Sequence, residues 1–336
     1  MIGRARVLAM LRGQATDHLP LMPITMMFAA DRAGVPYGRY AADGAVLAEA
    51  QLRIAEEFGF DHVSAISDPA REVCDLGGAI EWFEDQPPAI RGDAPVLSDK
   101  AKLARLTVPD PEAAGRMSDR LRGVRHLAQR AGGSLMVEGW VEGPCAMAAD
   151  LRGMSALMLD FTDDPQFVND LMDFAVRMEV LFAAAQVTAG ATLIGIGDAA
   201  ASLVGPRIYQ QFVLGWEQRL VEQIHALGVP ARLHICGNTK RIVRGMGETK
   251  CEIVDLDFLT PLSEARAVMG VDQVLLGNLD PVRALRDGTP ESVYAALAEC
   301  RAQAGPRYIV AAGCEVPRGT PAENMRAMAR YAAEHN

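Results

Sequence analysis

The chain has 336 residues, of which 50% are hydrophobic, and a formal net charge of −10 at pH 7. This composition predicts a globular protein with a substantial core, and the acidic balance gives no electrostatic reason to bind nucleic acid or an anionic membrane. No apolar run approaches the ~18 residues of a membrane span, and the first twelve residues have the pattern of an amphipathic helix, not of a signal peptide. We therefore expect a cytoplasmic protein without a membrane partner.

The chain contains six cysteines, at spacings unlike those of a small disulfide-stapled domain. In a cytoplasmic chain of this length we expect reduced thiols. Any functional cysteine is then a metal ligand or a nucleophile.

After the N-terminal helix, short apolar segments alternate with amphipathic helices such as 43–59, which Asp43 caps and Gly59 ends. The short segments have no helical period and are predicted to be buried parallel strands. They are 21–25, 62–67, 135–138, 192–195, 232–235, 252–256, 273–276 and 308–311. Eight alternations favour an α/β fold of the (β/α)8 TIM-barrel type over an open sheet, as a single domain spanning 1–336.

One stretch, 78–115, interrupts the alternation because it carries little helical signal. We interpret it as an insertion after the second strand, with a hairpin or lid character.

Soft metal ligands lie at the ends of two predicted strands. In an extended chain His234 and Cys236 project to the same side, and Cys314 follows the last strand 78 residues later. Across a barrel mouth these strand ends are on the order of 10 Å apart, which loops and side chains can bridge. Three nitrogen and sulfur ligands leave a fourth tetrahedral position open, as in catalytic zinc sites. The alternative is that these residues simply pack in the core, where free cysteine is common.

Polar residues also follow the other predicted strands, where barrel enzymes build their active sites. Asp198 and Asp257 are candidates for a catalytic, substrate-contacting or ligand-supporting role, and Glu142 for a partner at the rim. Asp68 and Asn278 occupy equivalent positions. An aspartate after a strand often caps the next helix, which is the structural alternative for this group.

Several segments together resemble the uroporphyrinogen decarboxylase superfamily, and within it the methylcobamide:coenzyme M methyltransferase branch. They are 195–202, ending at Ser202, then 234–239, 276–281 and 313–324. The resemblance implies that His234, Cys236 and Cys314 bind zinc, and we expect Ser202, Asn278, Glu142 and Asp68 to contact substrate. True uroporphyrinogen decarboxylases lack these ligands and have an Arg-Gln-Ala-Gly-Arg segment near the N-terminus, where this chain has Phe-Ala-Ala-Asp-Arg-Ala-Gly at 28–34.

The resemblance implies a zinc-dependent methyltransferase that moves a methyl group between a corrinoid and a thiol or similar acceptor. Zinc deprotonates a bound thiol at neutral pH, and the thiolate attacks the methyl group. The chain has no Asp-x-His-x-x-Gly cobalamin-binding segment, so a separate corrinoid protein is the expected partner; a homodimer is also compatible with the sequence.

Three alternatives stay open. They are decarboxylation of a tetrapyrrole, corrinoid-dependent demethylation of a methylated small molecule with zinc as Lewis acid, and a non-catalytic barrel in which zinc only holds two strand ends.

Overall fold

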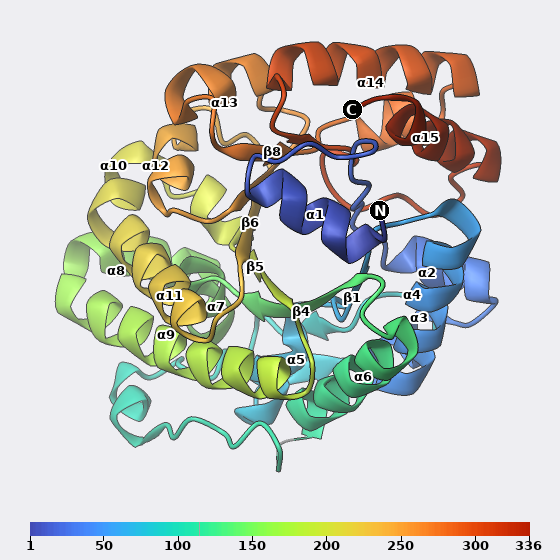
Figure 1. The fold of residues 1–336 in the computed structure, drawn as a ribbon. Helices are drawn as coiled ribbons and strands as arrows, with labels where there is room; N and C mark the ends of the chain where they lie inside the picture. Colours follow the sequence, from blue (N-terminus) through green and yellow to red (C-terminus); the bar gives the residue numbers. More distant parts are fainter. Residues whose placement is uncertain (114) are drawn as a thin grey trace.

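Seven parallel strands form one curved sheet in the structure, a computed structural model that describes residues 1–113 and 115–336 (Figure 1). They are β1 (His62–Ser64), β4 (Met136–Glu142), β5 (Leu193–Gly197), β6 (Ala231–Ile235), β7 (Ile253–Leu256), β8 (Val274–Leu276) and β9 (Tyr308–Ile309). The strands pair in this order. Nearly all their residues are buried, as expected for parallel strands whose outer face is covered by helices. The predicted α/β barrel is confirmed.

The segment around Leu21 closes the barrel between β9 and β1. The Val310 N–H donates to the Pro20 carbonyl at 2.8 Å, and the Met22 N–H donates to the Val310 carbonyl at 3.0 Å. On the other side, the Asp61 N–H donates to the Leu21 carbonyl at 3.0 Å. The predicted strand 21–25 is nevertheless wrong as a regular strand, because only Leu21 forms a bridge, with Val310. Prolines at 20 and 23 lack the N–H groups that a continuous ladder needs.

Helices surround the sheet and follow the strands in alternation. They are α1 (Gly3–Leu11), α2 (Met27–Ala33), α3 (Tyr37–Ala42), α4 (Gly44–Phe58), α5 (Ala70–Asp75), α6 (Gly115–Ala131), α7 (Pro144–Arg152), α8 (Met154–Asp163), α9 (Pro165–Thr188), α10 (Gly205–Ile208), α11 (Leu214–Ala226), α12 (Val243–Glu248), α13 (Leu262–Met269), α14 (Pro290–Ala304) and α15 (Ala322–Glu334). Short 3-10 turns cover Lys100–Arg105 and Ala199–Ser202, and π-helical turns cover Tyr209–Val213 and Pro281–Arg286.

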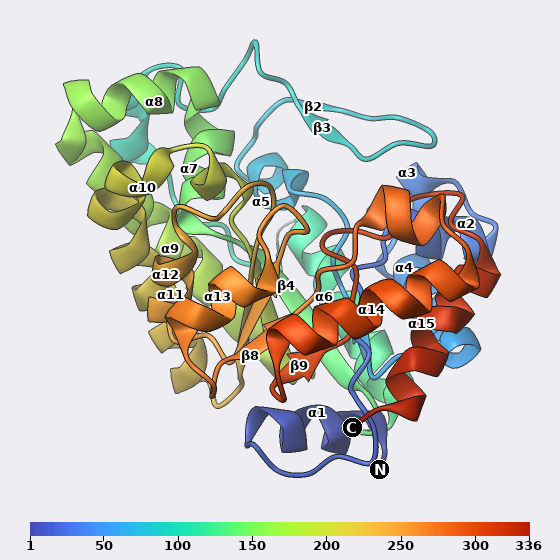
Figure 2. The ribbon, with the colours of Figure 1, turned by 90° about the horizontal axis from the view of Figure 1, so that it is seen from above.

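The two ends of the barrel are covered differently (Figure 2). Helix α1, the predicted N-terminal extension, lies across the end where the strands begin, and its Arg6 forms an ion pair with Asp61 just before β1. At the opposite end lies a two-stranded antiparallel hairpin of β2 (Ile80–Glu81) and β3 (Ala89–Ile90). The predicted insertion therefore carries a hairpin, and it lies on the side where the strands end.

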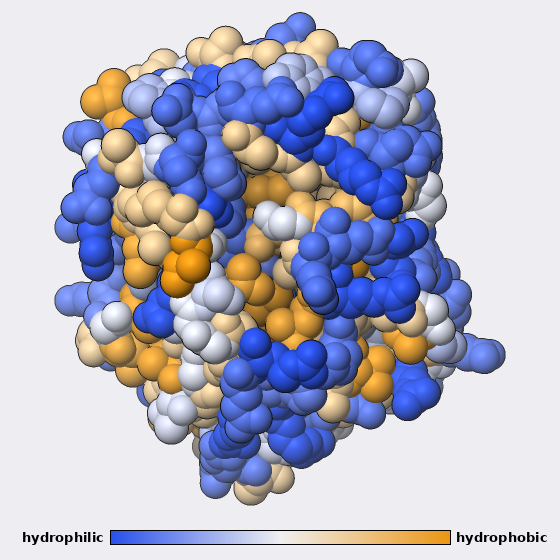
Figure 3. Space-filling model, turned by 45° about the vertical axis from the view of Figure 1, so that its right-hand side comes forward, coloured by the Kyte–Doolittle hydropathy of each residue, from blue (hydrophilic) through white to orange (hydrophobic). Residues whose placement is uncertain are grey.

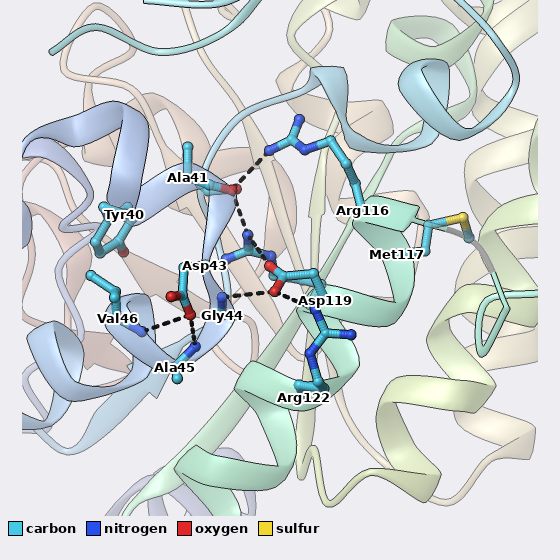
Figure 4. A network of polar contacts seen from close by, with 12 residues as sticks. Tyr40, Ala41, Asp43, Gly44, Ala45, Val46, Arg116, Met117, Asp119 and Arg122 are labelled. Carbon is cyan, nitrogen blue, oxygen red and sulfur yellow. Dashed lines mark hydrogen bonds and ion pairs between the residues drawn. The ribbon is translucent and has the colours of Figure 1, made fainter. Parts of the chain in front are cut away.

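A polar network holds the joint between α3 and α4 against α6 (Figure 4). Arg116 and Arg120 both donate to the Ala41 carbonyl, at 3.0 and 2.7 Å. The Gly44 N–H donates to Asp119 Oδ1 at 3.0 Å, and a Cβ on Gly44 would lie 2.4 Å from the Asp119 carbonyl oxygen. This close approach of α4 and α6 requires glycine at 44, and it fixes the helix from which Arg116 reaches the barrel mouth.

Hydrophobic residues also reach the surface. Figure 3 shows a face on which apolar side chains gather in a central hollow bordered by hydrophilic ones. Within 1–113 and 115–336, no helix combines the length and apolar character needed to cross a membrane.

Candidate metal and active site

The three predicted ligands come together at the end of the barrel where the strands finish. His234 lies on β6, Cys236 follows that strand directly, and Cys314 follows β9. The Nε2 atom of His234 is 3.8 Å from Sγ of Cys314. Two ligands of a tetrahedral zinc ion, at its usual nitrogen and sulfur bond lengths, lie about 3.5 Å apart. This pair therefore has nearly the spacing that such an ion needs.

All three residues line one inner cavity of about 250 Å³. Its other lining side chains are apolar, namely Ile24, Met26, Ile66, Pro69, Ala199 and Trp140, or acidic, namely Asp68, Glu142 and Glu315. As the side chains stand, no three acidic, histidine or cysteine residues in the described part of the chain form a closed metal cluster. The donor set nonetheless fits zinc, because one imidazole and two thiols face the same cavity and the imidazole is already oriented.

Asp255 on β7 orients the imidazole. The Nδ1 atom of His234 lies 3.1 Å from Oδ2 of Asp255, although the ring N–H is not aligned well enough for a hydrogen bond. This contact leaves Nε2 facing Cys314, which is the arrangement of carboxylate-histidine pairs behind bound metals. Burial alone would lower the pKa of His234, but Asp255 and Cys314 raise it well above its usual value. A metal ion at Nε2 would replace that proton.

The thiol of Cys236 lies in the same electrostatic environment. Burial raises its pKa, and the neighbouring charge of His234 opposes that shift. A buried thiol is protonated at neutral pH unless a cation or metal stabilises the thiolate.

Behind His234 a chain of buried charges runs through the barrel interior. Arg232 donates to Asp255 from Nε and Nη2, at 3.1 and 2.6 Å, and to Glu138 from Nη1 at 3.1 Å. Burial raises the pKa of Glu138 and opposes the lowering of the Asp255 pKa by Arg232 and His234. Sequence reasoning missed the role of Asp255. The alternation of side chains along β7 could have indicated it. Asp255 and Asp257 project to one face of β7, just as His234 and Cys236 project to one face of β6.

Asp257 supports the loop that carries Cys236. Its Oδ2 accepts from the Gly237 N–H at 2.8 Å and its Oδ1 from the Leu259 N–H at 2.9 Å. Asn278 lies behind this loop, where its Nδ2 donates to the carbonyls of Asp257 and Thr260 at 3.0 and 2.6 Å. Neither side chain lines the inner cavity. Both side chains hold the loop through these hydrogen bonds, and their predicted catalytic and substrate roles stay predictions.

Asp198 is completely buried. Its carboxylate accepts from the N–H groups of Cys145 and Ala146, at 3.2 and 2.6 Å, at the start of α7. Burial raises its pKa to about 6, against the opposing effect of these hydrogen bonds. Asp198 thus bonds to the start of α7, which precedes β5 in the chain, and its side chain does not cap the turn Ala199–Ser202 that follows it, as the capping alternative expected. Asp198 is not among the residues that line the inner cavity.

Glu142 and Asp68 do line the inner cavity, and each has an arginine partner. Glu142 Oε1 lies 3.2 Å from Nη2 of Arg71, and both Asp68 oxygens accept from Arg116 at 2.7 Å. Burial, together with nearby carboxylates, raises the pKa of Glu142 well above its usual value despite Arg71.

A second, outer cavity of about 550 Å³ adjoins the first, and both are lined by Pro69, Glu142, Ala199 and Cys236. Ser202 lines the outer cavity only, and its hydroxyl donates to the Ala199 carbonyl at 3.0 Å. Ile90 and Arg91, at the end of the hairpin, complete one wall. The inserted segment therefore borders the outer cavity that adjoins the inner one.

Among the lining residues that were not predicted, one is acidic and one is aromatic. Glu315, next to Cys314, accepts from the Met27 N–H at 2.7 Å, and burial raises its pKa to about 7. Trp140 packs with Ile24 and Ile66 in a small apolar cluster separate from the main core. The alternation along 135–142 gave a signal for Trp140, because it shares a strand face with Glu138 and Glu142.

The fold is an α/β barrel, and His234, Cys236 and Cys314 line a cavity at the end of the barrel where the strands finish. Residues 3–335 match the family model described as uroporphyrinogen decarboxylase (URO-D), and the chain belongs to that family.

Named relatives divide between two activities. The chain is 28% identical over 340 residues to the methylcobamide:CoM methyltransferase MtbA of Methanosarcina mazei, covering 99% of this chain and 98% of that one. It is 28% identical over 337 residues to the methylated-thiol–coenzyme M methyltransferase of the same organism, covering 98% and 88%. A uroporphyrinogen decarboxylase of Gloeobacter violaceus is 27% identical over 290 residues, covering 83% and 80%.

Among solved structures, a methyltransferase from Methanosarcina mazei superposes with a TM-score of 0.90 at 23% identity, covering 99% of both chains. At this identity the match shows the fold alone. The predicted family and the predicted resemblance to its methyltransferases are confirmed.

Proposed function

We propose that the protein is a zinc-dependent methyltransferase that moves a methyl group between a corrinoid, carried by a separate protein, and a thiol. The observation that carries the proposal is the convergence of His234, Cys236 and Cys314 on one cavity, with Asp255 behind the imidazole. The similarity to methyltransferases that carry corrinoid and thiol substrates in their names supports it.

In this proposal His234, Cys236 and Cys314 hold the ion. Zinc bound there would stabilise a substrate thiolate at neutral pH. Asp255 orients His234, and Asp257 fixes the Gly237 N–H and so the loop of Cys236. We assign both aspartates, and Asp198 at the base of α7, positioning roles. Glu142 and Asp68 form the substrate wall of the inner cavity, with Ser202 on the way in and Asn278 behind the loop.

The proposed methyl transfer requires no oxidant or reductant. The sulfur–carbon bond forms and the cobalt–carbon bond breaks, and the electron pair of the broken bond stays on the cobalt of the corrinoid substrate. The proton of the thiol leaves before the attack. The inserted segment 78–115, whose Ile90 and Arg91 wall the outer cavity, serves as a lid over this site.

A tetrapyrrole decarboxylase fits this cavity poorly. A substrate with many carboxylates needs cationic side chains, whereas the inner cavity is lined by three acids and by no lysine or arginine among the described residues. Its volume of about 250 Å³ is also below the usual range for drug-sized ligands, which begins near ~300 Å³.

The proposal is tested with methylcobalamin, a thiol and zinc-loaded protein, followed by the absorbance of the corrinoid. We expect loss of the methylcobalamin spectrum only when both thiol and protein are present. Cys236→Ala should abolish the reaction, whereas the control Cys74→Ala, a free cysteine outside the cavity, should not. Turnover by Cys236→Ala at the wild-type rate, or consumption of uroporphyrinogen in place of methylcobalamin, would contradict the proposal.

A further inference from the structure

The inner cavity has an unusual charge balance for a site that receives a small thiol. Its described lining includes Asp68, Glu142 and Glu315 but no lysine or arginine. A substrate with a sulfonate or carboxylate at its far end would have no cation to pair with there. Building on the proposed function, we infer that the site selects a methyl acceptor whose end remote from the sulfur is an ammonium group and discriminates against acceptors with an anionic end.

The arginines behind the cavity are already committed to protein carboxylates. Arg116 is held by both oxygens of Asp68. Arg71 is completely buried and is shared between Glu142 at 3.2 Å and Glu72 at 3.3 Å. Nε and Nη1 of Arg71 have no hydrogen-bond partner among the described residues, but neither Arg71 nor Arg116 lines the cavity, so an anion there meets Asp68 and Glu142 and not the guanidinium groups.

A further buried carboxyl group, that of Glu179, belongs to the same cluster of charges. Glu179 on α9 is fully buried, and neither of its oxygens has a hydrogen-bond partner among the described residues. Its pKa is raised well above the usual value by burial, followed by the charges of Glu72 and Glu142. Glu72, Glu142 and Glu179 therefore lie around Arg71, and burial raises the pKa of Glu142 and of Glu179 well above the usual value, which favours their protonated forms. A cation in the cavity favours ionisation of Glu142, whereas an anion opposes it.

Trp140 supplies an aromatic surface beside the acids. Its indole packs over β5, where a Cβ on Gly195 would lie 2.3 Å from ring atom Cε3 and a Cβ on Gly197 would lie 3.0 Å from Cζ2. Two glycines in one strand thus make room for the ring at the cavity wall. An aromatic face with carboxylates nearby is the usual environment for an alkylammonium group.

The outer cavity does not reverse this preference. Its described lining includes one cationic side chain, Arg91, which donates to Asp93 at 3.1 and 2.7 Å and is largely exposed. Asp150 lines the same cavity and has an unpaired buried oxygen. An anionic tail that reached outward would meet one solvated, already paired arginine.

The test uses three thiols of matched length, 2-aminoethanethiol, 2-mercaptoethanol and 2-mercaptoethanesulfonate. Each is titrated calorimetrically into zinc-loaded protein without a methyl donor, and each is then assayed as acceptor from methylcobalamin. We expect the ammonium thiol to bind about tenfold tighter than the sulfonate, with the alcohol between them. Equal or tighter binding of the sulfonate overturns the inference.

Two matched variants separate cavity charge from general effects. Glu142→Gln and Glu72→Gln each remove one carboxylate from Arg71, but only Glu142 lines the cavity. Glu142→Gln should lower the ammonium-to-sulfonate affinity ratio about tenfold, whereas Glu72→Gln should leave it unchanged. The same thiols are used with each protein, so comparing the ammonium-to-sulfonate affinity ratio between variants removes the effect of the different thiol pKa values. An equal fall in both variants overturns the inference. If Glu142→Gln does not fold, the inference is overturned when wild-type protein binds the sulfonate as tightly as the alcohol, since these two thiols have similar acidity.

The inference and the proposed function fail in different ways. If thiols bind in the expected order but none removes the methyl group from methylcobalamin, the proposed function is wrong and the charge preference stands. If methyl transfer occurs with the sulfonate preferred, the proposed function stands and the charge preference is wrong.

Discussion

Nδ1 of His234 lies 3.1 Å from Oδ2 of Asp255, while Nε2 of the same ring lies 3.8 Å from Sγ of Cys314. One imidazole thus joins the buried ion-pair chain of the barrel interior to the cavity at its mouth. Because Asp255 fixes the ring orientation, it should control metal affinity without touching the metal.

Asp255→Asn should weaken zinc binding about 10- to 100-fold. The matched control is Glu138→Gln, which removes the other partner of Arg232 but does not contact His234. Competition with a chromogenic chelator measures both affinities. Equal losses in the two variants would assign the effect to Arg232 and not to the orientation of His234.

Asp257→Ala should weaken metal binding and methyl transfer, because it frees the Gly237 N–H and loosens the loop of Cys236. Loss of two backbone hydrogen bonds should also cost about 1–3 kcal/mol of unfolding free energy. Asp280→Ala is the control, since Asp280 also accepts two backbone N–H groups, from Val282 and Arg283. A zinc affinity that falls as much in Asp280→Ala as in Asp257→Ala would contradict this role of Asp257.

Asp150 should make stability depend on pH. Burial, and then the charges of Glu72 and Asp198, raise its pKa from 3.8 to about 8. The folded protein then holds a proton that the unfolded chain has lost, so the contribution is full below pH 3.8 and is lost as the pH rises through 8. Asp150→Asn should therefore be more stable than wild type at pH 9, by at least about 1 kcal/mol.

Urea unfolding at pH 5 and pH 9 measures this difference. The exposed Asp163→Asn serves as control and should change neither value. An Asp150→Asn variant with the same pH dependence as wild type would show that Asp150 does not hold a proton in the folded state.

Gly195→Ala should disturb the cavity wall, because the new methyl group would lie 2.3 Å from Cε3 of Trp140. We expect a loss of about 1–3 kcal/mol in unfolding free energy and slower methyl transfer. Gly215→Ala, in α11 with no atom within 4 Å of the new methyl group, should instead stabilise the protein by up to about 1 kcal/mol. Thermal unfolding compares the two, and the wall is not tightly packed if both alanines are tolerated alike.

The alternation of strands and helices, and the meeting of His234, Cys236 and Cys314, were predictable from sequence. Period-two and helical patterns are local, and parallel strand ends meet at one face of a barrel. The irregular pairing of the closing segment 21–25 was not predicted from sequence. Regular pairing needs backbone N–H groups along the segment, and the prolines at 20 and 23 have none.

The direction in which a side chain points after the end of a strand also could not be predicted from the local sequence pattern. Asp198 and Asp257 follow their strands as predicted, yet Asp198 turns to the start of α7 and Asp257 to the loop of Cys236. Which backbone N–H group lies within reach is decided by neighbouring strands. The catalytic roles predicted for these two residues stay predictions, and Asp257→Ala addresses that of Asp257.

The most direct test is zinc-edge X-ray absorption of the protein purified without chelator. We expect about one zinc per chain, with two sulfur ligands at ~2.3 Å and one imidazole nitrogen at ~2.0 Å. A further sulfur should enter the shell when a substrate thiol is added. Protein without zinc, or zinc in a shell that contains no sulfur, would contradict the proposed zinc site.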